Sequence, residues 1–190
     1  MKVIGICGPS CSGKSSLANA LKEELNCDSI SVDFFYSFET PKTYVKHEGE
    51  EIRSFERPEH YDGERVAKII KEIRENKIAE VKRLPHETSK KFIEETLEEK
   101  PFLIIEGFQI LNYPSLVEQI NISFYVDIPF EESIKRRVQR YNRGAKDDDY
   151  VKIGKSEWER MGLNQKEKAN FIIDGTKKIN QLKKEVLEKL

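Results

Sequence analysis

Residues 8–15 read GPSCSGKS and match the phosphate-binding pattern G-x-x-x-x-G-K-[ST] without a mismatch. A short apolar run, residues 3–7, precedes them, and Leu17, Leu21 and Leu25 follow at helical spacing. A strand, a glycine-rich turn and a helix in this order direct backbone N–H groups and a helix N-terminus at a polyphosphate. The chain is therefore expected to fold as an α/β protein that handles a nucleoside triphosphate.

The composition indicates one domain that binds neither nucleic acid nor membrane. The chain has 190 residues, enough for a single buried core. Its 33 Lys and Arg residues nearly balance 34 Asp and Glu residues, whereas nucleic-acid binders usually show a basic excess. No run has the length of a membrane-spanning helix, and the motif begins too early to leave room for a signal peptide. We expect a cytoplasmic protein.

The three cysteines, Cys7, Cys11 and Cys27, are an odd number and argue against a disulfide framework. Cys7 is interpreted as a small core residue of the first strand. Cys11 lies inside the phosphate-binding loop and has two open interpretations. It is either a tolerated loop residue or a reactive thiol beside the anion-binding amides.

Short apolar runs alternate with amphipathic segments along the chain. The predicted strands are residues 2–7, 29–32, 102–105, 122–126 and 171–173. The predicted helices are residues 15–25, 63–76, 92–99, 130–142, 155–161 and 177–190. This alternation predicts a three-layer α/β fold, with a five-stranded parallel sheet flanked by helices and ligands at the carboxyl ends of the strands. Residues 37–59 and 144–154 fit no element and are interpreted as functional loops.

Lys14, Ser15 and two carboxylates are the candidates for phosphate chemistry. In this motif the lysine reaches the β- and γ-phosphates and the serine hydroxyl holds Mg²⁺. Glu106 ends an apolar strand, where it is either an acid that helps to position magnesium or part of an ordinary turn. Asp33 follows the second strand and is either the acceptor of a hydroxyl proton or a turn residue. Phe35 and Tyr36, next along the chain, are either core residues or walls of a base pocket.

Arginines cluster on one predicted helix. Arg136, Arg140 and Arg143 share a face at i, i+4 and i+7, and Arg137 lies off that face. Such a cluster before a polar loop is typical of a lid that closes over transferring phosphates. A solvated basic face is the alternative.

These residues together resemble the uridine kinase family of P-loop kinases, which includes the nicotinamide riboside kinases. Residues 33–36, DFFY, are similar to the family motif Asp-x-Phe-[Tyr/Phe], which implies that Asp33 is the catalytic base. Residues 55–62, FERPEHYD, resemble the uridine kinase stretch Phe-Asp-His-Pro-x-x-Phe-Asp and place Glu56 where an aspartate binds the ribose hydroxyls. Asp62 is a second candidate for the ribose, or the N-cap of the next helix.

Other segments are similar to one branch or depart from both. Residues 104–108 and 111–113 are similar to the nicotinamide riboside kinases, as are residues 174–176, where the adenine site of the family lies. Residues 128–132 and the following arginines resemble the lid entry of both branches. Uridine kinases read the pyrimidine with a Tyr-Asp-…-His-Ser-Arg hairpin. Here residues 81–90 lack the tyrosine and offer His86, as a substitute or as a surface residue.

The resemblance implies a three-layer P-loop kinase fold in one domain, residues 1–190, with an acceptor-binding insertion at 34–62 and a lid at 136–160. The implied reaction is transfer of phosphate from ATP, with Mg²⁺, to the 5′-hydroxyl of a small riboside. The acceptor is expected to be uridine or cytidine, with nicotinamide riboside as the alternative. A regulatory nucleotide switch is the rival from another class, but the Asn-Lys-x-Asp motif of guanine-specific switches is missing from the sequence.

The implied residues fall into four groups. ATP is expected to contact Gly8, Ser10, Ser12, Gly13, Lys14, Ser15, Ser16, Gly175 and Thr176. The riboside is expected to contact Asp33, Phe35, Tyr36, Glu56, Asp62 and Arg140. Lys14, Arg136 and Arg140 would neutralise the transferring phosphoryl group, with Asp33 as base. Ser15 and Glu106 would hold the metal.

Overall fold

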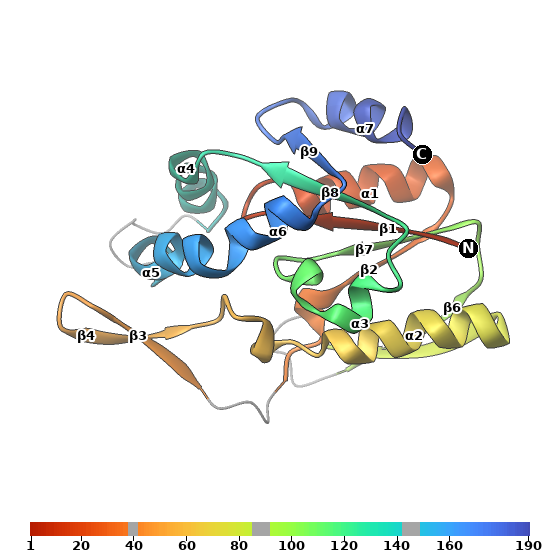
Figure 1. The fold of residues 1–190 in the computed structure, drawn as a ribbon, viewed down its shortest axis with the longest axis horizontal. Helices are drawn as coiled ribbons and strands as arrows, with labels where there is room; N and C mark the ends of the chain where they lie inside the picture. The colour runs from red at the N-terminus through yellow and green to blue at the C-terminus, as the bar shows by residue number, and fades with distance from the viewer. Residues whose placement is uncertain (38–41, 85–91, 142–148) are drawn as a thin grey trace.

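The computed structural model describes residues 1–37, 42–84, 92–141 and 149–190 (Figure 1). Its central sheet contains five parallel strands in the order β2-β7-β1-β8-β9. Their bounds are β1 Lys2–Cys7, β2 Asp28–Ser31, β7 Phe102–Glu106, β8 Ile122–Asp127 and β9 Phe171–Asp174. The predicted five-stranded parallel sheet is confirmed.

The strands are almost continuously apolar because helices cover both faces of the sheet. Helices α1 (Lys14–Leu25) and α7 (Ile179–Leu187) cover one face, and their leucines pack with Ile4, Ile6 and Phe124. Helices α2 (Gly63–Asn76) and α3 (Pro114–Val117) cover the other face. The three-layer arrangement is therefore confirmed.

The strand register brings the predicted site residues to one edge. Glu106, at the end of β7, is paired with Ile6 of β1 and with Ser31 of β2. The phosphate-binding loop directly follows β1, and Asp33 lies in the short 3₁₀ turn after β2. Three consecutive strands of the sheet thus present their carboxyl ends, and the polar residues after them, on the same side.

Two antiparallel ribbons were not predicted. Residues 92–99 were expected to form a helix, which is wrong: β6 (Ile93–Glu98) pairs with β5 (Ile78–Arg83). Ala79 and Val81 of this ribbon, with Leu97, are buried in the core beneath α2. Burial of one face of a ribbon outweighs the helix-favouring composition of residues 92–99.

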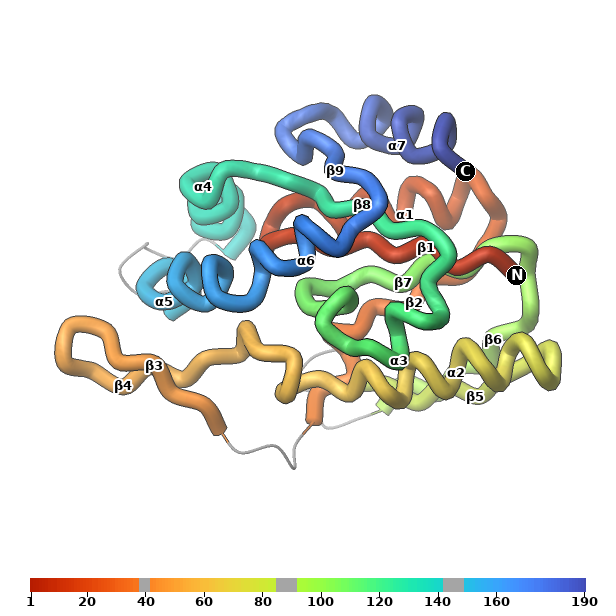
Figure 2. Tube along the Cα trace, viewed as in Figure 1, coloured from red at the N-terminus to blue at the C-terminus, as the bar shows by residue number. Residues whose placement is uncertain are grey.

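The acceptor-binding insertion also contains regular structure where a loop was expected. Strands β3 (Thr43–His47) and β4 (Glu50–Ser54) form an antiparallel hairpin. Its two turn residues, Glu48 and Gly49, have φ values of 49° and 88°, the positive values that a type I′ turn needs. Figure 2 shows the hairpin alongside α5, with which both strands are in contact.

The lid region is helical on both sides of the undescribed residues 142–148. Helix α4 (Phe130–Tyr141) enters it, and α5 (Asp149–Glu157) continues through a π-helical turn (Trp158–Gly162) into α6 (Leu163–Lys168). The helix predicted at 155–161 is thus part of a longer helical run. In the described ranges, none of the helices combines the length and hydropathy of a membrane span.

Candidate active site

The loop between β1 and α1 is shaped to bind an anion. Gly8 approaches the neighbouring strand closely, since a Cβ at this position would lie 2.5 Å from the carbonyl oxygen of Val126. Gly13 has a φ of 102° and precedes α1 without a side-chain cap. The N–H group of Leu17 donates to the carbonyl of Gly13 at 2.9 Å and makes the first helical bond. The three preceding N–H groups have no acceptor within the helix and are available to phosphate oxygens.

A cavity of about 910 Å³ opens beside this loop. Side chains from the phosphate-binding loop, the ends of β2 and β7, the acceptor-binding insertion and the lid helices line it. Its size lies in the range of small-molecule sites, and it is found where α/β sheets bind ligands. The predicted donor, acceptor and lid segments therefore share one space.

Ser15 and Glu106 meet at the foot of this cavity. The Ser15 hydroxyl donates to Glu106 Oε2 at 3.2 Å. Burial raises the pKa of Glu106, the charge of Asp33 raises it further, and Lys14 opposes the rise. The described residues include no group of three or more His, Cys, Asp and Glu side chains that could hold a metal. A hydroxyl and a carboxylate whose charge is only partly balanced by Lys14 are ligands that suit Mg²⁺. This ion commonly takes one or two protein carboxylates and completes its shell with phosphates and water.

Asp33 faces the same space from the end of β2. Its side chain is exposed and lines the cavity, and Oδ1 accepts a 3.4 Å hydrogen bond from the N–H group of Phe108. This oxygen also lies 3.2 Å from where a Cβ on Gly107 would be. The glycine after Glu106 therefore leaves room for Asp33 beside the metal-binding candidates.

The arginines of α4 contact the phosphate-binding loop in an arrangement that differs from the one predicted by their spacing along the helix. Arg136 donates to the carbonyl oxygens of Gly175 at 3.1 Å and Ser12 at 3.4 Å. Arg137, placed off the predicted face, donates to Ser10 Oγ at 3.3 Å and stacks 4.5 Å over Tyr150. Arg136, Arg137 and Arg140 all line the cavity. Arg143 lies outside the described residues, as does His86.

Aromatic rings line the part of the cavity that is predicted to hold the acceptor. Tyr36, Phe55 and Tyr61 line it, with ring centroids 6.2 Å apart for Tyr36 and Phe55 and 5.9 Å apart for Tyr36 and Tyr61. Phe35, proposed as a substrate contact, is instead 4% exposed and packs in the core with α2. The chain turns through a 3₁₀ segment after β2, so that Phe34 lines the cavity in its place.

Three further candidates lie away from this cavity. Asp62 is the N-cap of α2, where Oδ1 accepts from the N–H group of Arg65 at 2.9 Å, and it does not line the cavity. Gly175 and Thr176 likewise lie outside it, and Thr176 borders a separate hollow of about 540 Å³ at the ends of β8 and β9. Gly175 remains connected to the donor site through Arg136.

Two hydrogen bonds hold the backbone of Glu56, and its carboxyl group lies near charged side chains that line the cavity. Its N–H group donates to Ser54 Oγ at 3.2 Å, and its carbonyl accepts from Gln109 Nε2 at 2.6 Å. Burial raises the pKa of Glu56 to about 7, with Arg137 and Lys14 opposing the rise and Asp33 adding to it. These neighbours place the carboxyl group close to Asp33 and Lys14, which are predicted to act in phosphate transfer.

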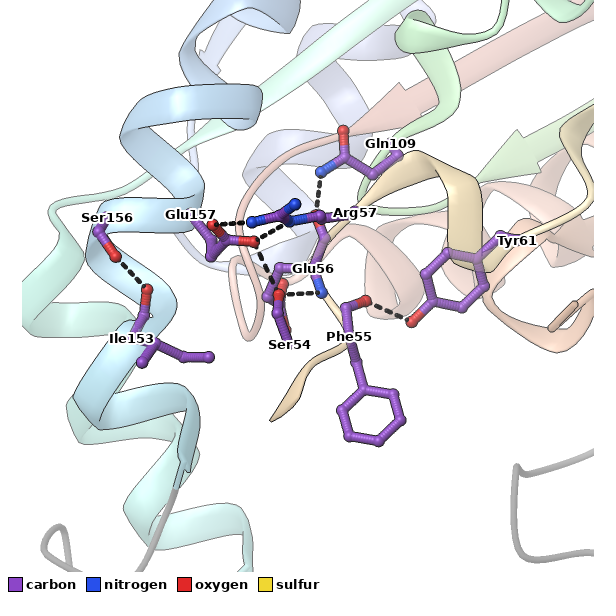
Figure 3. A network of polar contacts seen from close by, with 9 residues as sticks. All are labelled: Ser54, Phe55, Glu56, Arg57, Tyr61, Gln109, Ile153, Ser156 and Glu157. Carbon is purple, nitrogen blue, oxygen red and sulfur yellow. Dashed lines mark hydrogen bonds and ion pairs between the residues drawn. The ribbon is translucent and has the colours of Figure 1, made fainter. Parts of the chain in front are cut away.

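Arg57 forms a buried ion pair with Glu157 of α5, next to Glu56 (Figure 3). Glu157 of α5 is 3% exposed and accepts from Arg57 Nε at 2.8 Å, Arg57 Nη2 at 3.3 Å and Ser54 Oγ at 2.7 Å. Burial raises the pKa of Glu157, but the hydrogen bonds from Arg57 and Ser54 hold it below its usual value. Sequence reasoning missed this pair because its members are 100 residues apart in the chain.

The chain is similar in sequence to a known protein family and to named kinases. The model of the Phosphoribulokinase / Uridine kinase family matches residues 3–177. A uridine kinase from Psychromonas ingrahamii is 29% identical over 143 residues, which cover 73% of this chain and 68% of the relative. Human nicotinamide riboside kinase 1 is 32% identical over 139 residues, which cover 73% of this chain and 64% of that protein.

Solved structures share the fold at lower identity. A possible uridine kinase from Bacillus stearothermophilus has a TM-score of 0.57 at 18% identity, over 91% of this chain and 88% of that chain. Phosphoribulokinase from Rhodobacter spheroides has a TM-score of 0.63 at 13% identity, over 93% of this chain and 72% of that chain. The three-layer P-loop kinase fold is therefore shown.

Proposed function

The chain belongs to the phosphoribulokinase and uridine kinase family, and on that premise we propose that it phosphorylates the 5′-hydroxyl of a ribonucleoside with ATP. Uridine or cytidine is the proposed acceptor. One observation carries the proposal: Lys14, Asp33 and Glu106 line a single cavity together with an aromatic acceptor end. A donor site without an acceptor space would fit a nucleotide switch equally well.

The donor half binds and neutralises the triphosphate. In the proposed mechanism the free N–H groups at the start of α1 and the Lys14 ammonium hold the β- and γ-phosphates. Ser15 and Glu106 would hold Mg²⁺, which when bound neutralises phosphate charge. Arg137 and Arg140 line the cavity from the lid side and stabilise charge on the transferring group.

Asp33 is the proposed base. The 5′-oxygen of the riboside attacks the γ-phosphorus, the bond from phosphorus to the ADP oxygen breaks, and the hydroxyl proton passes to the Asp33 carboxylate. Phosphoryl transfer asks little covalent chemistry of a protein, so positioning and electrostatics supply most of the rate. The Phe108 N–H group bonded to Asp33 Oδ1 orients the carboxylate for this role.

Glu56 is proposed to bind the ribose hydroxyls. Its backbone is fixed from both sides by Ser54 and Gln109, and its carboxyl group is electrostatically close to Asp33. A carboxylate that accepts from two vicinal hydroxyls would direct the 5′-carbon of the sugar toward Asp33. The base would then lie among Tyr36, Phe55 and Tyr61.

Nicotinamide riboside is the second candidate, favoured by the 32% identity to human nicotinamide riboside kinase 1. A panel of ribosides separates the two, with purified protein, ATP and Mg²⁺ and the product identified by mass spectrometry. Phosphorylation of uridine or cytidine supports the first proposal, and phosphorylation of nicotinamide riboside alone reverses the order. ATP turnover that no riboside stimulates would contradict both and favour a nucleotide switch.

A further inference from the structure

The hairpin of the acceptor-binding insertion places one guanidinium group in the acceptor end of the cavity. Arg53 lies on β4, opposite Tyr44 of β3, and its side chain lines the cavity. Arg53 Nη2 donates to the Tyr36 hydroxyl at 2.5 Å, and the guanidinium carbon lies 4.3 Å over the Phe55 ring. A hydrogen bond at one end and a ring face beneath it fix the orientation of this planar group.

The fixed guanidinium group retains an unused donor. Arg53 Nε is buried and has no hydrogen-bond partner, and no carboxylate of the described residues lies within ion-pair distance of Arg53. A buried N–H group without an acceptor is costly, more so when it is charged. A ligand oxygen in the cavity would meet this uncompensated cation at the terminal nitrogens of its guanidinium group.

A second guanidinium group lies on the same side of the site. Arg83 of β5 lines the cavity, and its guanidinium carbon lies 5.4 Å from the centre of the Phe34 ring. Arg83 is paired with Glu95 at 2.8 Å, whereas Arg53 has no such compensation. Two aromatic rings of the cavity, Phe34 and Phe55, thus already lie against a cation of the protein and are less able to attract a cationic ligand.

The Glu56 carboxyl group is surrounded by charged groups other than Arg53. The charged groups that act most on the Glu56 carboxyl are Arg137, Asp33 and Lys14, which belong to the phosphate-transfer end. Arg53 is not among them and acts on His60, behind Tyr36. The guanidinium group of Arg53 between Tyr36 and Phe55, without an ion-pair partner among the described residues, therefore favours a neutral base over a cationic one.

We propose that Arg53 is the specificity-determining residue of the acceptor site, selecting a base that is uncharged and carries a carbonyl oxygen. A terminal N–H group of the guanidinium donates to that oxygen, while the Tyr36 hydroxyl accepts from Nη2. A pyridinium base is disfavoured because it brings a second positive charge beside Arg53. This inference rests on the proposed riboside kinase function and adds the class of base.

Three acceptors separate the effect of charge from the effect of shape. Uridine is neutral, nicotinamide riboside is a cation, and its 1,4-dihydro form has almost the same shape and the same carboxamide but no charge. We expect the wild-type protein to have a kcat/KM at least about tenfold higher for the dihydro form than for the cation. A preference for the cation, or equal use within twofold, would overturn the inference.

Variants at Arg53 test the residue itself. Arg53→Gln should lower kcat/KM for uridine about 10- to 100-fold, mainly through KM, and should reduce the discrimination between the two nicotinamide forms. Arg53→Lys keeps the charge without the planar fork, so it should lose uridine affinity and retain the discrimination. Lys46→Gln, on an exposed position of the neighbouring strand, is the matched control and should change neither quantity.

The outcomes distinguish this inference from the proposed function. ATP affinity and thermal unfolding, measured on each variant, show whether the fold and the donor site persist. If the wild-type protein phosphorylates no riboside, the proposed function fails and this inference with it. If ribosides are phosphorylated and folded Arg53→Gln keeps both the uridine KM and the discrimination, the inference alone is wrong.

Discussion

Replacing Arg57 with methionine removes the cation from a buried pair and leaves its carboxylate behind. Glu157 is 3% exposed and receives two of its three hydrogen bonds from Arg57. Breaking one side of a buried ion pair costs about 3–5 kcal/mol, because the remaining charge is desolvated without compensation. Arg57 is 16% exposed, which lets water reach part of the site, so we expect the lower end of this range.

A matched set of variants shows whether the cost comes from the unpaired charge. A loss of about 3 kcal/mol corresponds to a fall in Tm of roughly 6–12 °C for a domain of this size. Replacing Arg57 and Glu157 together with methionine removes both charges, so the double variant should be more stable than Arg57→Met. Lys155→Met removes an exposed cation from the same helix and should change the free energy of unfolding by no more than about 0.5 kcal/mol.

Urea unfolding at pH 7, followed by circular dichroism, measures these differences. A loss below about 1 kcal/mol in Arg57→Met, or a double variant less stable than Arg57→Met, would refute the reasoning about an uncompensated charge. The pair also bears on activity because Ser54 bonds both Glu157 and the N–H group of Glu56. The folded double variant should therefore show about a tenfold higher KM for the riboside with an unchanged KM for ATP.

Further predictions concern three parts of the cavity, namely Glu56, the magnesium candidates and Cys11. The pKa of Glu56 is about 7, above its ordinary value of 4.5. The value of kcat/KM for the riboside should therefore rise between pH 6 and 8 in the wild type. In Glu56→Gln it should stay flat over the same range. The same shift means that the folded state binds the proton more tightly, so the contribution of Glu56 to stability should fall as pH rises from 4.5 to 7. Ser15→Ala and Glu106→Gln should each raise the Mg²⁺ concentration needed for half-maximal activity roughly tenfold, with Asn19→Ala as an unaffected control. Cys11 lines the cavity, so saturating ATP should slow its alkylation, and equal rates would place the thiol away from the nucleotide.

The sequence predicted the parts of the site that follow from strand ends. Asp33 and Glu106 each come at the end of a buried strand, and parallel strands carry such residues to one edge. The phosphate-binding motif fixed the position of that edge, so Lys14 and Ser15 were placed correctly in the cavity.

Contacts between distant segments were not predictable in the same way. The segment 93–98 has the composition of a helix and is a strand because it pairs with β5 along its length and buries Leu97 in the core with α2. Phe35 lies in the core and Phe34 lines the cavity because a 3₁₀ turn follows β2. Arg137 reaches Ser10 through the approach of α4 to the loop, which depends on packing and not on spacing along the helix.

The role of Asp33 is the central claim, and one comparison tests it most directly. Uridine phosphorylation by the wild type and by Asp33→Asn is measured by mass spectrometry of the product, with ATP affinity measured by calorimetry on both proteins. The account predicts formation of uridine 5′-monophosphate by the wild type, a loss of about 10²–10⁴-fold in kcat in Asp33→Asn, and unchanged ATP affinity. An Asp33→Asn protein that keeps its turnover would contradict it.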